Sequence, residues 1–254
     1  MLSVGVIAWI GAVFLAAGFV KGAVGMGLPT VAMGLLAVTM PPAQAAALLL
    51  IPSLVTNLWQ LFTGPSFGGL CKRLWTMMAG VVLGTVAGAG LLTGTHSGVA
   101  SAGLGAALVL YAILGLLKLG FTTPARHEAL VSPLVGVATG LVTGATGVFV
   151  IPAVPYLQSL RLGREDLIQA LGLSFTVSTA ALALGLFKAG AFASATMQLA
   201  GSVLALAPAL AGMFAGQALR QAMSVETFRT VFFAGLLMLG GYLVLEAALW
   251  SSAS

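Results

Sequence analysis

The polar side chains that could bind a substrate lie inside apolar stretches of this 254-residue chain. One of them is a cation, Lys21, and the others are hydroxyl and amide groups that follow two glycine-rich segments. This neutral set comprises Ser53, Thr56, Asn57 and Gln60 in the first half, and Ser174, Thr176, Ser178 and Thr179 in the second. A single positive charge among neutral donors suits an oxyanion that must be bound weakly enough to leave again.

Lys21 has two interpretations. A lysine at the centre of a bilayer costs at least roughly 2.5–3.5 kcal/mol, so one that is retained there is expected to contact substrate or to gate its passage. Alternatively, Lys21 lies near a membrane face and extends its ammonium outward to water. Its counterpart in the second half is Thr143, which has no charge, so any role of the charge is asymmetric.

The two glycine-rich segments, residues 18–29 and 140–152, are copies of one another at an offset of 122 residues. The identities pair Gly18 with Gly140, Val20 with Val142, Gly22 with Gly144, Ala23 with Ala145 and Gly25 with Gly147. Glycine costs a helix roughly 1 kcal/mol relative to alanine. Gly/Pro interruptions at matching places in two halves indicate the binding site of a transporter. We therefore predict helix breaks from Lys21 to Pro29 and from Thr143 to Gly147.

Glycines at four-residue spacing have a second interpretation, the close packing of helices. We prefer packing for one group of these glycines, namely Gly80, Gly84, Gly88, Gly212 and Gly216. For Gly22, Gly25, Gly144 and Gly147, recurrence beside Pro29 and Pro152 favours the break, so these four join the predicted substrate site. Asn57 and Gln60 could line the same site or bond neighbouring helices, and either role satisfies a buried amide.

The composition is that of a polytopic α-helical membrane protein. The chain is 60% hydrophobic and 6% charged, with a mean hydropathy of +1.13, whereas soluble domains are about 25% charged. Apolar runs of roughly 20 residues recur along it. The net charge of +5 is spread thinly over the loops, which argues against nucleic-acid binding. No acidic residue falls within a predicted mid-membrane segment, which argues against a carboxylate proton relay.

Each half is predicted to be one broken helical hairpin followed by three transmembrane helices. The first repeat, residues 1–120, contains the hairpin 4–40 and the spans 45–62, 75–94 and 99–117. The second repeat, residues 121–254, contains the hairpin 131–160 and the spans 168–187, 196–219 and 229–249. The hairpin arms are expected to have 16–17 residues in the first repeat and about 12 in the second, the latter too short to cross.

Basic residues decide the topology. If each broken segment crossed the membrane once, one membrane face would carry five basic loop residues and the other face four. If each returns as a hairpin, one face carries Lys72, Arg73, Lys118, Arg126, Arg161, Arg164, Arg220 and Arg229. The opposite face then has only Lys188. The positive-inside rule favours the hairpins, which places both termini outside and inverts the two halves relative to each other.

The segment Gly18-Phe-Val-Lys-Gly-Ala-Val-Gly-Met-Gly-Leu-Pro29, its weaker copy, and the helix with Asn57, Trp59 and Gln60 resemble the TauE/SafE family of membrane exporters. The resemblance covers essentially the whole chain. It implies export of sulfur-containing anions such as sulfite and sulfoacetate, with uptake in some members. It also implies a multi-pass protein of the bacterial cytoplasmic membrane.

The favoured function is therefore a secondary transporter that exports such anions by alternating access around the two hairpins. The alternatives are an anion channel and an importer of organosulfur or carboxylate anions. An enzyme would need paired carboxylates, a metal set or an activated nucleophile, and the sequence shows none. The expected partners are a small anion and the lipid bilayer, with no nucleic acid and no cofactor; a homodimer stays open.

Overall fold

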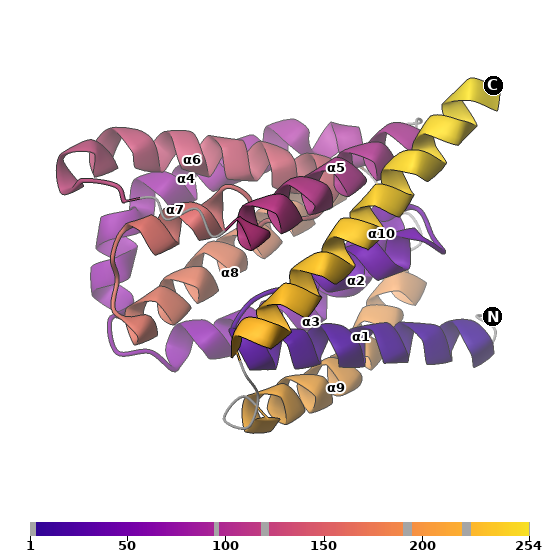
Figure 1. Cartoon of the computed structure of the whole chain (residues 1–254), viewed down its shortest axis with the longest axis horizontal. Coiled ribbons are helices and arrows are strands. Elements are labelled where there is room, and N and C mark those ends of the chain that lie inside the picture. The colour runs from indigo at the N-terminus through magenta and orange to yellow at the C-terminus, as the bar shows by residue number, and fades with distance from the viewer. Residues whose placement is uncertain (1–3, 94–96, 118–121, 190–194, 220–224, 254) are drawn as a thin grey trace.

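The computed structural model describes residues 4–93, 97–117, 122–189, 195–219 and 225–253. Within these residues the chain is entirely helical, with ten α-helices and no strand (Figure 1). The helices are α1 (Val4–Val24), α2 (Leu28–Ala37), α3 (Pro42–Phe62), α4 (Phe67–Thr93), α5 (Ser97–Leu116), α6 (Ala125–Thr146), α7 (Ala153–Ser159), α8 (Arg164–Lys188), α9 (Ala195–Leu219) and α10 (Val225–Ala253). This confirms the predicted all-α class. Lys118 and Arg220 lie outside the described residues.

Eight of the helices are long and apolar enough to cross a membrane, and α2 and α7 are not. At 1.5 Å per residue, the 10 residues of α2 and the 7 of α7 reach about 15 and 10 Å, against roughly 30 Å of hydrocarbon. They can therefore only be short return arms. The expected 12-residue first arm of the second hairpin is wrong, because α6 has 22 residues. Its first turn, which begins at Ala125, includes the polar residues Arg126, His127 and Glu128, and a helix end near water needs no apolar side chains.

The first helix break is shorter than predicted, and the second begins later along the chain than predicted. The first covers only Gly25 to Gly27, where Gly25 and Gly27 take φ of 80° and 104°, in a region that favours glycine. The second covers residues 147–152 and begins at Gly147, whose φ is 73°. The expectation that the breaks begin at Lys21 and Thr143 is therefore wrong. Those residues, together with Gly22 and Gly144, belong to regular helix.

Close packing between α1 and α9 explains why Gly22 stays helical. A Cβ atom on Gly18 would lie 2.1 Å from the Ala209 carbonyl oxygen, and one on Gly22 would lie 2.0 Å from that of Met213. From the other side, a Cβ on Gly212 or Gly216 would lie 2.1 Å from a carbonyl oxygen of α1. These distances confirm the packing role predicted for Gly212 and Gly216. They give Gly22 the same role in place of the predicted break.

Helices α4 and α6 pack in the same way. A Cβ on Gly140 would lie 2.3 Å from the Val81 carbonyl oxygen, and one on Gly144 would lie 2.4 Å from that of Thr85. The facing glycines of α4 are Gly80, Gly84 and Gly88, each with a carbonyl oxygen of α6 within 2.8 Å of its added Cβ, which confirms their predicted packing role. Near the N-terminal ends of these two helices, the carboxylate of Glu128 accepts hydrogen bonds from Arg73 at 2.6 and 2.8 Å.

The two packed pairs place the polar helices between them. Figure 1 shows α4 and α6 along one edge of the molecule, α1 and α9 along the other, and α3 and α8 between them. Helices α3 and α8 are the most deeply buried of the candidate spans. The first two turns of α4, α6 and α8 gather at one end, opposite the N- and C-terminal ends (Figure 1). They carry the basic residues Lys72, Arg73, Arg126 and Arg164, and we call this the basic end.

Candidate functional site

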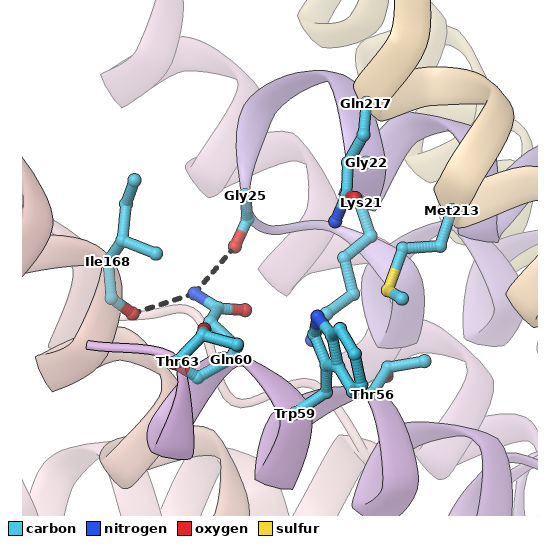
Figure 2. Close-up of a pocket in the computed structure, with 10 residues that line it drawn as sticks. All are labelled: Lys21, Gly22, Gly25, Thr56, Trp59, Gln60, Thr63, Ile168, Met213 and Gln217. Carbon is cyan, nitrogen blue, oxygen red and sulfur yellow. Dashed lines mark hydrogen bonds between the residues drawn. The ribbon is translucent and has the colours of Figure 1, made fainter.

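A cavity of about 120 Å³ lies where α1, α3 and α9 end and α8 begins. These helix termini face the basic end of the molecule (Figure 1). Figure 2 shows the residues that line the cavity, which are Lys21, Gly22, Gly25, Thr56, Trp59, Gln60, Thr63, Ile168, Met213 and Gln217. Lys21 is the one charged residue among them, and none of the acidic residues that the structure describes lines the cavity.

Lys21 is turned into the protein. It lies in the last turn of α1, only 3% of its surface is exposed, and its side chain runs toward α3 (Figure 2). Its ammonium donates a hydrogen bond to Asn57 Oδ1. Among the described residues it forms no ion pair. The structure thus places the ammonium at an interior cavity rather than extended outward, and two of its three N–H donors remain for a ligand.

Two neutral side chains beside Lys21, those of Thr56 and Gln60, donate their protons to backbone carbonyl oxygens. The Thr56 hydroxyl donates to the Pro52 carbonyl oxygen at 2.7 Å. The Gln60 amide donates to the carbonyl oxygens of Gly25 at 3.0 Å and Ile168 at 2.8 Å (Figure 2). Gln60 therefore joins the first break to α8, and its amide protons are not free to bind a substrate. The charged donor is the one best placed to hold an anion.

Asn57 and Thr179 meet in the interior and connect the two halves of the chain. Asn57 Nδ2 donates to Thr179 Oγ1 at 3.4 Å, and Thr179 Oγ1 donates to the Phe175 carbonyl oxygen at 2.7 Å. The two residues are separated by 122 positions, which is also the offset between the glycine-rich segments. A polar chain therefore runs from Lys21 through Asn57 to α8.

Three of the predicted site residues are buried hydroxyls away from this cavity. Ser53, Ser174 and Ser178 are each 0% exposed, and none lines the cavity. Their hydroxyls have no hydrogen-bond partner within the described part of the chain. They come from α3 and α8, the two central helices, so they add polar groups to the interface that also holds Asn57 and Thr179.

The second hairpin places its residues differently from the first. The Thr143 hydroxyl is buried and donates to the Thr139 carbonyl oxygen at 2.7 Å. Gly144 packs against α4, and Gly147 caps α6 beside the Met33 side chain. None of these residues lines the Lys21 cavity. The structure brings together Lys21, Gly22, Gly25 and Gln60 on the cavity, with Asn57 and Thr179 behind it, and leaves the second break elsewhere.

Sequence reasoning missed the contribution of α9. Met213 and Gln217 complete the cavity wall, one helical turn apart. Their signal was faint: Gln217 is a single amide that directly follows the packing glycine Gly216. Trp59 also lines the cavity, and its ring meets that of Phe214 edge-on at 6.2 Å. Its position four residues before Thr63 on α3 gave no hint of this.

The arrangement can bind an anion. Among the described residues there is no group of three His, Cys, Asp or Glu side chains that could hold a metal ion. Lys21 has neither an acidic partner nor a general base beside it in the cavity lining. A desolvated ammonium with free donors is what a compact anion requires.

Comparison with known families supports this conclusion. Residues 10–243 match the family described as Sulfite exporter TauE/SafE. Neither a curated protein nor a solved structure matches the chain. The match covers nearly all of an all-helical chain with eight candidate membrane spans. This multi-pass membrane protein therefore belongs to the TauE/SafE sulfite exporter family of transporters.

Proposed function

We propose that this chain exports small sulfur oxyanions, with sulfite as the first candidate, across the bacterial cytoplasmic membrane through the Lys21 cavity. The observation that carries this proposal is the position of Lys21, a buried ammonium at the basic end of the molecule that lines a cavity without an acidic residue from the described part of the chain. A cation retained in a membrane interior is a functional group by default. The family supplies the substrate class, sulfite in its description.

The size of the cavity favours the smallest member of that class. Pockets for drug-sized ligands measure roughly 300–1,000 Å³, and this one measures about 120 Å³. Such a volume suits an anion of a few heavy atoms. It favours sulfite over a longer sulfonate such as sulfoacetate, which would require the cavity to widen.

The location of the cavity and the membrane potential favour export. The basic end is cytoplasmic by the positive-inside rule, so the cavity faces the cytoplasm in this conformation. An inside-negative potential drives anion exit by about 2.3 kcal/mol per charge per 100 mV. A carrier with no coupling ion would then already act as an exporter, whereas uptake would need coupling.

The two hairpins supply the means of alternating access in this proposal. Gly18 packs on Ala209 as Gly140 packs on Val81, so the α1–α9 pair is the counterpart of the α6–α4 pair. This correspondence supports a chain built from two inverted halves. Movement of one pair relative to the other would open the Asn57–Thr179 region first to one side and then to the other.

Counterflow in proteoliposomes tests the proposal. Vesicles loaded with sulfite, sulfoacetate, sulfate, taurine or a carboxylate are placed in labelled sulfite. We expect accumulation of label with internal sulfite and a weaker response to sulfoacetate. Voltage-driven anion leak without counterflow would identify a channel. The absence of both would overturn sulfite as the substrate.

A further inference from the structure

The structure gives Lys21 a partner from within the protein, the amide oxygen of Asn57. We propose that Asn57 is an internal ligand, which occupies the Lys21 ammonium when no anion is bound and is displaced when one binds. Thr179 is a positioning residue that holds the Asn57 amide in the orientation this requires. The inference rests on the proposed function, because it concerns the anion that Lys21 binds.

The hydrogen bonds fix the direction of the Asn57 amide. Thr179 has one hydroxyl proton, and this proton is donated to the Phe175 carbonyl oxygen at 2.7 Å. Its oxygen can therefore only accept a hydrogen bond from Asn57, and it faces Asn57 Nδ2 at 3.4 Å. A reversed amide would set its NH₂ group against the ammonium and its oxygen against a hydroxyl with no proton to give. Both contacts would be unfavourable, so Oδ1 points to Lys21.

The burial of all three side chains makes this orientation important. Lys21 is 3% exposed, Asn57 0% and Thr179 1%, so each depends on the others for its polar contacts. Without an anion, Oδ1 is the one side-chain oxygen among the described residues that accepts from the ammonium. An incoming anion first meets the two N–H donors that Asn57 leaves free, and it competes with Oδ1 for the third, so the oxygen in turn helps to expel the anion. This competition lowers the affinity of the site for the anion and speeds release of the anion, as a carrier requires.

The chain of contacts also joins the two halves. Asn57 lies on α3 and Thr179 on α8, at positions 122 residues apart that correspond in the repeat alignment. A change in how α3 and α8 lie against each other would therefore weaken the hydrogen bond between Asn57 and Thr179. This would alter the hydrogen bond between Asn57 Oδ1 and the Lys21 ammonium. Substrate release would in this way be linked to the relative position of the halves.

Two substitutions at Thr179 distinguish a residue that positions the Asn57 amide from one with a purely structural role. Thr179→Val keeps the β-branched shape but removes the oxygen that accepts from Asn57. It should loosen the internal ligand, so that the dissociation constant for labelled sulfite and the KM for transport fall about threefold to tenfold. Vmax should fall as well, because release slows. Thr179→Ser retains the hydroxyl and should behave as the wild type. A purely structural role predicts a lower Vmax with KM unchanged or raised.

Asn57→Asp tests the same inference in the opposite direction. It places a carboxylate on Lys21 as a permanent internal anion, so sulfite affinity should fall at least tenfold while the purified protein keeps its thermal stability. If Thr179→Val does not accumulate in the membrane, Thr179→Ala removes the same oxygen without the branched carbon and replaces it in the test.

The results distinguish the two levels of the proposal. Wild-type protein that neither binds nor transports sulfite would overturn the proposed function. Wild-type transport with a sulfite affinity that is unchanged or weaker in Thr179→Val would overturn only the internal ligand. Opposite shifts for Thr179→Val and Asn57→Asp, with Thr179→Ser normal, would support it.

Discussion

At the scale of single residues, the notable feature is a lysine that has no counter-ion within the described ranges of the chain. Lys21 faces an amide oxygen, and no carboxylate from those ranges lines its cavity. A carboxylate would satisfy the ammonium so well that an incoming anion could not compete, whereas an amide satisfies it only in part. The absence of acids from the cavity lining is therefore consistent with a site that holds its anion briefly.

Removal of this charge should abolish high-affinity transport. Lys21→Gln replaces the ammonium with a neutral amide of similar length, so the anion loses a charge-assisted hydrogen bond worth roughly 1.5–3 kcal/mol. We expect KM for sulfite to rise about tenfold to hundredfold. The measurement is initial rate against sulfite concentration in proteoliposomes with equal protein content.

Lys188→Gln is the matched control, because Lys188 is exposed and lies in the last turn of α8, far from the start of α8 where the cavity forms. It should transport as the wild type does. Equal KM values in the two variants would show that Lys21 does not contact the anion.

At the scale of elements, glycine serves two different purposes that the sequence presents together. Gly25, Gly27 and Gly147 take positive φ and end or interrupt helices. Gly22 and Gly144 lie three residues before such positions, yet they stay helical and bring carbonyl oxygens of the neighbouring helix to within 2.0–2.4 Å of where a Cβ atom would sit. Lys21 is positioned by the second purpose, because the packing of α1 on α9 fixes the helical turn that carries it.

Gly22→Ala should therefore destabilise the protein while leaving the break itself unchanged. Its methyl group would meet the Met213 backbone at 2.0 Å, and overpacking of this kind costs about 1–3 kcal/mol. We expect a lower unfolding temperature in detergent, with weaker transport because the cavity wall shifts. Gly11→Ala is the control in the same helix: nothing lies within 4 Å of its added Cβ. That variant should be as stable as the wild type or slightly more stable.

At the scale of the whole molecule, orientation decides which face the cavity serves. Cys71 lies in the second turn of α4 at the basic end, and it is partly buried. If that end is cytoplasmic, a membrane-impermeant maleimide should leave Cys71 unlabelled in intact cells and label it after lysis. Lys188→Cys in a Cys71→Ser background should show the opposite pattern, with labelling in intact cells. Labelling of Cys71 in intact cells would show that the basic end is extracellular. The cavity would then face outward, and its location would no longer favour export.

The sequence by itself determined the class of the protein and the residues worth attention. Length, hydropathy and the low charge predicted an all-α membrane protein, because apolar runs of that length can only be satisfied as helices in lipid. The motif around Gly18–Pro29 indicated the family that comparison then showed. Lys21, Asn57, Gln60 and Thr179 were singled out because polar groups are costly in an apolar run.

Only the tertiary structure decided what those residues contact. A four-residue glycine spacing looks the same whether it breaks a helix or packs one, because the difference lies in the backbone of a neighbouring helix distant in sequence. The cavity needs α9, whose Met213 and Gln217 lie almost 200 residues from Lys21. The pairing of Lys21 with Asn57 and of Asn57 with Thr179 is equally non-local. Spacing along one helix indicates which face a residue occupies, but not what covers that face.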